Sequence, residues 1–73
     1  MARFPRHQKV IGEKIRQFRK RAKFTQEALA EKADLHPVYL GELERGEESA
    51  SVHCLMRIAK ALRVRVRDLV DEI

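Results

Sequence analysis

The chain has 73 residues, a mass of 8.5 kDa and a formal net charge of +5. Its 37% charged and 44% hydrophobic residues are typical of one small folded domain and exclude a disordered tail. No apolar run reaches the roughly 20 residues of a membrane-spanning helix, and the charged first five residues do not resemble a signal peptide. We therefore expect a cytoplasmic protein without a membrane partner.

Cysteine and histidine are too few to build a metal site. Cys54 is the single cysteine, so an internal disulfide is impossible. The three histidines are scattered, whereas a structural zinc site needs four ligands at set spacings. A chain of this size also has few residues with which to enclose a ligand pocket. We expect no metal, no cofactor, no small-molecule ligand and no enzymatic activity.

Positive charge is concentrated in the first third of the chain. The first 24 residues carry nine lysines or arginines and one acid, Glu13. Residues 35–50 carry four glutamates and one arginine. A basic segment attracts polyanions, and nucleic acid is favoured over an anionic membrane, although a solvated helix face has the same composition.

The first predicted element is a basic helix over about residues 8–22. It rests on apolar residues that recur at helical spacings of four, three and four. These residues are Ile11, Ile15, Phe18 and Ala22. Pro5 disfavours helix before it. We assign residues 1–9 to a basic N-terminal arm and residues 10–73 to a single domain.

Two short helices are predicted next. Thr25 is a good N-cap for a helix over about residues 26–32, and Asp34 tolerates the left-handed conformation of the turn that follows. Pro37 suits the first position of a third helix, although His36 is a poor N-cap for it. Gly46 closes this helix. Gly41 lowers the stability of the middle of this helix. The glycine indicates either that another backbone approaches closely there or that the helix simply tolerates it.

The fourth predicted helix has the strongest apolar stripe, and Ser51 is its cap. The stripe consists of Val52, Leu55, Met56, Ile58, Ala59 and Leu62. A short fifth helix is predicted over about residues 67–72. Strand-like alternation is too short to pair, so the predicted fold class is all-α, a compact five-helix bundle.

The second and third predicted helices carry the functional signal. Two short helices joined by a turn of three to four residues form a helix-turn-helix, which lays its second helix in the major groove of DNA. Residues 24–30 (FTQEALA), 35–46 (LHPVYLGELERG) and 55–62 (LMRIAKAL) resemble three motifs of XRE-type, Cro/CI-like domains. Within that family the chain looks closest to the controller proteins of restriction–modification systems. The resemblance implies a lambda-repressor-like fold with its recognition helix at about residues 36–46.

The resemblance also implies roles for single residues. Thr25 and Gln26 match residues that bond a DNA phosphate, because a helix N-terminus presents free N–H groups to an anion. Arg45 matches a contact to the DNA backbone. Arg19 and Glu44 match a salt bridge between the first and third helices. The alternatives are that Gln26 is a solvated polar residue and that Glu44 is a plain surface acid.

Helical geometry selects the base-facing residues independently. Leu40 and Leu43 face inward, so the other side of the third helix faces DNA. That side consists of His36, Pro37, Val38, Gly41, Glu42 and Arg45. Val38 can touch a thymine methyl, Glu42 can accept from cytosine, and Arg45 can reach guanine or phosphate. Because Pro37, Val38 and Gly41 cannot hydrogen-bond a base edge, we expect moderate discrimination between sequences, partly through DNA shape.

The chain departs from the family pattern at three places. The loop after the recognition helix is acidic over residues 47–48, where the family carries lysine or arginine. Asp34 and Arg63 stand where the family carries glycine. We expect the basic arm, with Arg3, Arg6 and Lys9, and the first helix to supply the contacts that the acidic loop lacks, to the DNA backbone or in the minor groove.

These observations predict a transcriptional regulator of bacterial or phage type, a repressor or controller that binds double-stranded DNA at the nucleoid as a homodimer. The expected dimer surface consists of apolar residues of the last two helices that the core does not need. The alternative is that these residues belong to the core of the single domain. These residues are Val52, Val66, Leu69, Val70 and Ile73. The acidic segment supports a rival hypothesis, a protein-binding adaptor or antitoxin-like module with the same fold.

Overall fold

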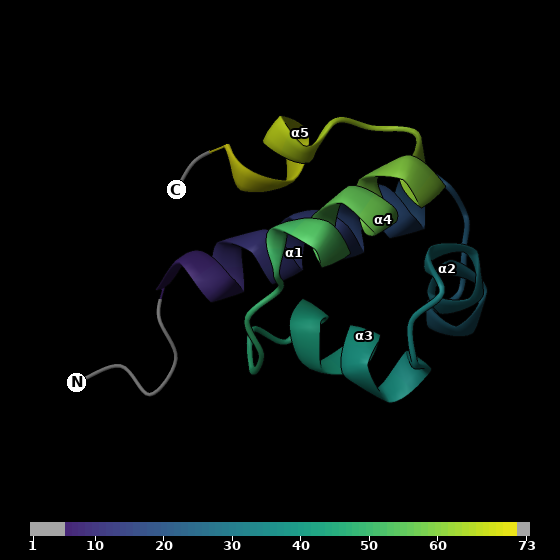
Figure 1. The fold of residues 1–73 in the computed structure, drawn as a ribbon, viewed down its shortest axis with the longest axis horizontal. Helices are drawn as coiled ribbons and strands as arrows, with labels where there is room; N and C mark the ends of the chain where they lie inside the picture. The colour runs from purple at the N-terminus through teal and green to yellow at the C-terminus, as the bar shows by residue number, and fades with distance from the viewer. Residues whose placement is uncertain (1–5, 72–73) are drawn as a thin grey trace.

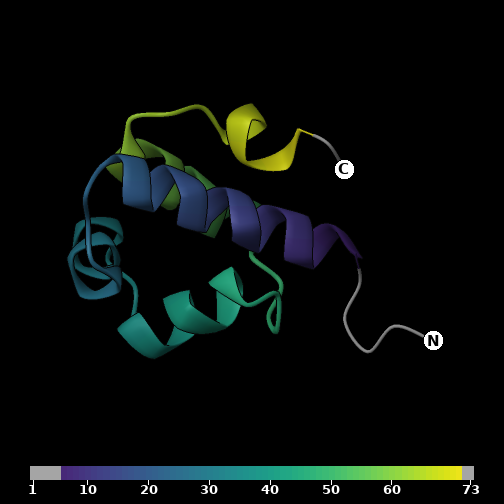
Figure 2. The same ribbon diagram turned by 180° about the vertical axis from the view of Figure 1, so that it is seen from behind.

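The computed structural model describes residues 6–71, which form five helices (Figure 1). These are α1 (Arg6–Arg21), α2 (Gln26–Ala33), α3 (Pro37–Glu44), α4 (Val52–Leu62) and α5 (Val66–Val70). The described part of the chain contains no strand, so the all-α prediction is confirmed. The longest helix, α1, packs against α3 on one side and α5 on the other, while α2 packs against α3 and α4 (Figures 1 and 2).

The helix ends differ from the predicted ones. α1 begins at Arg6 instead of Gln8, so Arg6 and Lys9 lie in its first turn and not in an extended arm. α3 is shorter than predicted because residues 36 and 45 are its caps. α5 begins at Val66 and ends at Val70. Apolar spacing predicts the middle of a helix well, but the ends depend on capping geometry.

The core contains one large and fully buried side chain from each of the five helices. These are Ile15, Leu29, Leu40, Ile58 and Leu69. Fully burying a side chain of this size contributes about 1.5–3 kcal/mol to stability. The predicted place of Leu69 in a dimer surface is therefore wrong, because this side chain is 0% exposed within one chain.

Polar side chains cap three of the helices. Thr25 Oγ1 accepts from the Ala28 N–H at 3.0 Å, and Ser51 Oγ accepts from the Cys54 N–H at 3.0 Å, as predicted. His36 Nδ1 accepts from the Val38 N–H at 3.1 Å. The expectation that His36 caps poorly is corrected, since its unprotonated ring nitrogen replaces the usual side-chain oxygen.

Four helices end in a residue of positive φ, and three of these residues are not glycine. Asp34 and Arg63 have φ of 58° and 60°, and Lys23 has φ of 62°. Gly46 follows α3 with φ of 76°, and the Glu47 N–H donates to the Glu42 carbonyl at 2.9 Å. Gly46 closes α3 as its sequence position predicted, and the hydrogen bonds are those of the Schellman arrangement.

Gly12 lets α1 cross the end of α3 at close range. A Cβ on Gly12 would stand 2.8 Å from the carbonyl oxygen of Glu44, which is backbone and cannot move aside easily. The sequence pattern gives no signal for this close contact. This contact sets the distance between the basic face of α1 and the predicted recognition helix.

Candidate nucleic-acid interface

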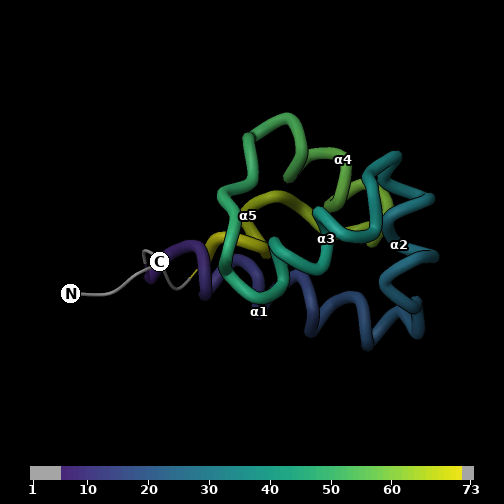
Figure 3. Tube along the Cα trace, turned by 90° about the horizontal axis from the view of Figure 1, so that it is seen from below, coloured from purple at the N-terminus to yellow at the C-terminus, as the bar shows by residue number. Residues whose placement is uncertain are grey.

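The helix-turn-helix consists of α2, the turn of residues 34–36, and α3. Figure 3 views the molecule from the side on which α3 lies. Arg57 of α4 holds the turn in place. Its Nε donates to the Ala33 carbonyl at 2.9 Å, and its Nη2 donates to the Asp34 carbonyl and pairs with the Asp34 carboxylate. This contact fixes the end of α2, and with it the start of α3, relative to the core.

The outer face of α3 presents the predicted base-reading residues unevenly. Val38 is 62% exposed, His36 and Pro37 are exposed, and Glu42 is half-buried. Gly41 is buried, which contradicts its assignment as a base-reading position. The side chains of Arg45 and Gln26 cover it, since a Cβ there would lie 3.2 Å from Arg45 Nη1 and 3.6 Å from Gln26 Oε1.

The N-terminus of α2 lies beside this face. A shallow hollow between the two helices is lined by Gln26, Glu27, Pro37, Val38, Gly41 and Arg45. The N–H groups of Gln26 and Glu27 belong to the first turn of α2 and have no partner within the helix. The geometry therefore brings a helix end with free N–H groups, the predicted phosphate site, and the predicted recognition helix to one surface.

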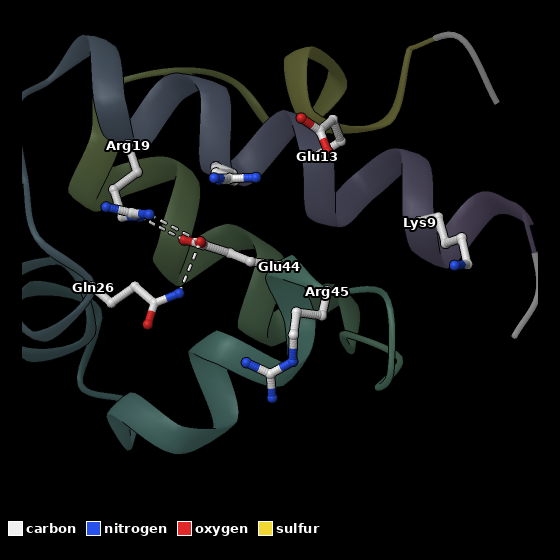
Figure 4. A pocket seen from close by; sticks show the side chains of 7 residues that line it. Lys9, Glu13, Arg19, Gln26, Glu44 and Arg45 are labelled. Carbon is white, nitrogen blue, oxygen red and sulfur yellow. Dashed lines mark hydrogen bonds and ion pairs between the residues drawn. The ribbon is translucent and has the colours of Figure 1, made fainter.

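A buried ionic cluster joins α1, α2 and α3 behind this surface (Figure 4). Glu44 is 7% exposed and is the one buried charged side chain among the described residues. Arg19 donates to it through Nε at 2.7 Å and Nη2 at 3.1 Å, and Gln26 Nε2 donates at 3.0 Å. Arg19 Nη1 also donates to the Phe24 carbonyl at 2.9 Å. The structure thus places Glu44 as an internal acid whose charge is neutralised by Arg19, and the Gln26 amide of a half-buried side chain donates to it.

The predicted phosphate contacts divide between two regions of the surface. Lys9 and Arg45 line an open hollow between α1 and α3, and Arg6 lines another hollow along α1 that Lys9 also borders. Arg3 lies outside the described residues. Arg16 also lines the hollow between α1 and α3, and the expectation from the sequence covered it only as part of the basic first helix. Its helical spacing from Lys9 and Arg19 was the available signal, because residues three and seven apart share a face.

Arg45 has an acidic partner in the loop after α3. Its Nε donates to Glu47 Oε2 at 3.0 Å, and its Nη2 donates to Oε1 at 3.1 Å. This hydrogen bond is the main cause of a lowered pKa of Glu47 and a raised pKa of Arg45. Both groups remain ionised at neutral pH, so Arg45 faces any DNA with a carboxylate at its side.

The predicted dimer surface is only partly available. Val66 and Val70 are half-buried against the core, and Ile73 lies outside the described residues. Val52 is 69% exposed, and Met56 one turn later on α4 is 55% exposed. These two side chains form the exposed apolar patch that remains on α4 after the core is closed.

No group of three or more histidine, cysteine, aspartate or glutamate side chains among the described residues is arranged to hold a metal ion. None of the described helices is long and apolar enough to span a membrane.

This geometry is that of a helix-turn-helix protein, and comparison with known proteins shows the family. Residues 15–69 match the family described as Helix-turn-helix (HTH_3), which covers well over half of the chain. The chain therefore belongs to the HTH_3 helix-turn-helix family, and the resemblance stated from the sequence is confirmed.

Its relatives include restriction–modification controllers. Control protein C.BamHI of Bacillus amyloliquefaciens is 40% identical over 63 residues, which cover 85% of this chain and 78% of that protein. The crystal structure of the controller protein C.AhdI from Aeromonas hydrophila has a TM-score of 0.83 at 31% identity and covers 85% of this chain and 94% of that chain. The crystal structure of SinR, the master regulator for biofilm formation, in complex with DNA has a TM-score of 0.81 at 35% identity. The match covers 84% of this chain and 98% of that chain.

Proposed function

We propose that the chain regulates transcription by binding double-stranded DNA with α3 in the major groove. The observation that carries this proposal is the position of the α2 N-terminus beside the exposed face of α3, next to a hollow lined with basic residues of α1. A helix N-terminus binds phosphate, while a helix in the groove presents its outer residues to the bases. The controller relatives and the DNA complex of SinR support the proposal.

In this proposal the side chains have separate tasks. Thr25 and Gln26 contact phosphate through the first turn of α2, and Lys9 and Arg16 do so from α1. Val38 meets a thymine methyl and Glu42 meets cytosine. His36 accepts at Nδ1, so its Nε2 carries the hydrogen and is free to donate to a phosphate oxygen.

The first experiment selects binding sites from a randomised duplex library and then measures affinity by fluorescence anisotropy at several salt concentrations. We expect log affinity to fall with log salt at about −0.9 per phosphate neutralised. Arg16→Ala should weaken binding to every duplex and reduce that slope by about 1. Lys60→Ala removes the same charge from the exposed surface of α4 and is the matched control. A wild-type protein that binds no duplex at low salt would contradict the proposal and favour the protein-binding adaptor.

We also propose that two chains associate through Val52 and Met56. These side chains are four residues apart on the exposed face of α4, so they present one apolar patch to a second copy. A single chain reads a short half-site, and a two-fold dimer on paired half-sites extends the contact. Sedimentation should show a dimer that Met56→Glu dissociates, whereas Lys60→Ala should leave it intact. A monomer at every concentration tested argues against this surface.

A further inference from the structure

The contact between Arg45 and Glu47 leaves one edge of the guanidinium open. A guanidinium has five N–H donors. Glu47 accepts from Nε and from one hydrogen of Nη2, so both hydrogens of Nη1 and the second hydrogen of Nη2 are left. These hydrogens lie along the end of the group, and this edge matches O6 and N7 of guanine in a bidentate contact.

The open edge lies over the middle of α3 and not beyond its end. Nη1 is 3.2 Å from the position that a Cβ of Gly41 would occupy, one turn before Arg45. The glycine leaves room for the guanidinium, which shares a hollow with the exposed Val38. Figure 4 shows the Arg45 side chain pointing away from Glu44, so the buried acid does not hold it.

The charge of Glu47 makes a phosphate a poor partner for Arg45. A carboxylate beside the guanidinium repels a phosphate that approaches the same group, since both are anions. A guanine edge is neutral and is not repelled in this way. The same carboxylate would also keep the long arginine side chain in one orientation, which reduces the entropy lost on binding.

We propose that Glu47 is a positioning residue that turns Arg45 into a guanine-reading side chain in the middle of the recognition helix. Gly41 supplies the space and Glu47 holds the other edge. This inference rests on the proposed DNA binding and deepens it, because it assigns a base identity to one position of each half-site.

The test compares wild type with Glu47→Gln and Glu48→Gln by selection from a randomised duplex library. Glu48 is the neighbouring exposed acid, so its substitution removes the same charge without touching Arg45. Wild type should select a guanine at one position of each half-site. Glu47→Gln should lose that preference, with discrimination against the other bases falling by about fivefold or more. Glu48→Gln should keep the guanine and only raise binding to all duplexes.

Equal behaviour of the two variants would overturn the inference, because Glu47 would then act only through its charge. A wild-type motif without a guanine would overturn it as well. A wild-type protein that binds no duplex would refute the proposed function. In that case the effect of Glu47 on the orientation of Arg45 is tested in the free protein. The side-chain Nε–H resonance of Arg45 should shift in Glu47→Gln and in Gly41→Ala, and an unchanged resonance in Glu47→Gln refutes it. Alanine is the better helix former, so Gly41→Ala should stay folded.

Discussion

Gly12 of α1 lies against the main chain of Glu44 at the end of α3, with 2.8 Å between that carbonyl oxygen and the place of an absent Cβ. The close crossing brings the basic side of α1 next to the recognition helix. A main-chain contact of this kind leaves no flexible atom to absorb a larger residue.

Gly12→Ala should destabilise the protein by about 2 kcal/mol, even though alanine is the better helix former, because it forces α1 away from α3. Urea unfolding followed by circular dichroism measures the change. Gly41→Ala is the matched control, since its new methyl would meet only the side chains of Arg45 and Gln26. Equal stability of the two variants would show that the crossing is not tight.

Arg19→Met should destabilise the protein by about 3 kcal/mol, because it leaves the buried Glu44 carboxylate with only the Gln26 amide as a partner. The double variant Arg19→Met with Glu44→Met should recover much of that loss. Chemical unfolding of the four proteins gives the coupling between the two residues. A coupling near zero would mean that the pair is solvated in solution.

Arg63→Gly should stabilise the protein by about 1 kcal/mol, because a side chain in the left-handed conformation is strained and glycine is not. Thermal unfolding would show this as a higher Tm. Arg65→Gly supplies the control, since Arg65 has φ of −95° and should gain nothing. If both variants lose stability, unfolded-state entropy outweighs the strain.

The stability of the protein should fall as the pH rises through the alkaline range. Burial is the main cause of a raised pKa of the Cys54 thiol and of a raised pKa of the Tyr39 hydroxyl. The unfolded chain therefore releases the Cys54 proton at a lower pH than the folded protein does, from about pH 8.5 upward. Because the unfolded state binds fewer protons there, a further rise in pH favours unfolding. Urea unfolding at pH 7.0, 8.5 and 10 should show a steeper loss for wild type than for Cys54→Val. Identical slopes would remove Cys54 from this explanation.

Local signals in the sequence predicted the helices and the interface region because each signal acts within one turn. Apolar spacing together with capping residues and Pro37 predicted all five helices, and the position of Gly46 predicted the left-handed residue after α3. Gly12 escaped notice since a glycine inside a helix does not indicate which distant main chain approaches it. Leu69 was misassigned because an apolar residue has the same pattern whether it closes the core or meets a second chain.

The details of the site depended on side-chain geometry that spacing does not show. The acidic loop was read as a lost phosphate contact, whereas Glu47 lies against Arg45 through two hydrogen bonds. Gly41 was placed on the exposed face by its helical angle, but long neighbouring side chains cover it. Rotamers decide both outcomes, and they follow from packing between residues that sequence order alone does not relate.

The single core to which every helix contributes one fully buried side chain also bears on how the protein opens. Removing any one helix would expose the buried side chains of the other four, so we expect no pair of helices to stay folded as a fragment. The amide hydrogens in the middle of all five helices should therefore exchange with deuterium at one common rate, that of global unfolding. The recognition helix α3 would then unfold only when the whole domain unfolds, and α2 with α3 would not fold when moved alone into another protein.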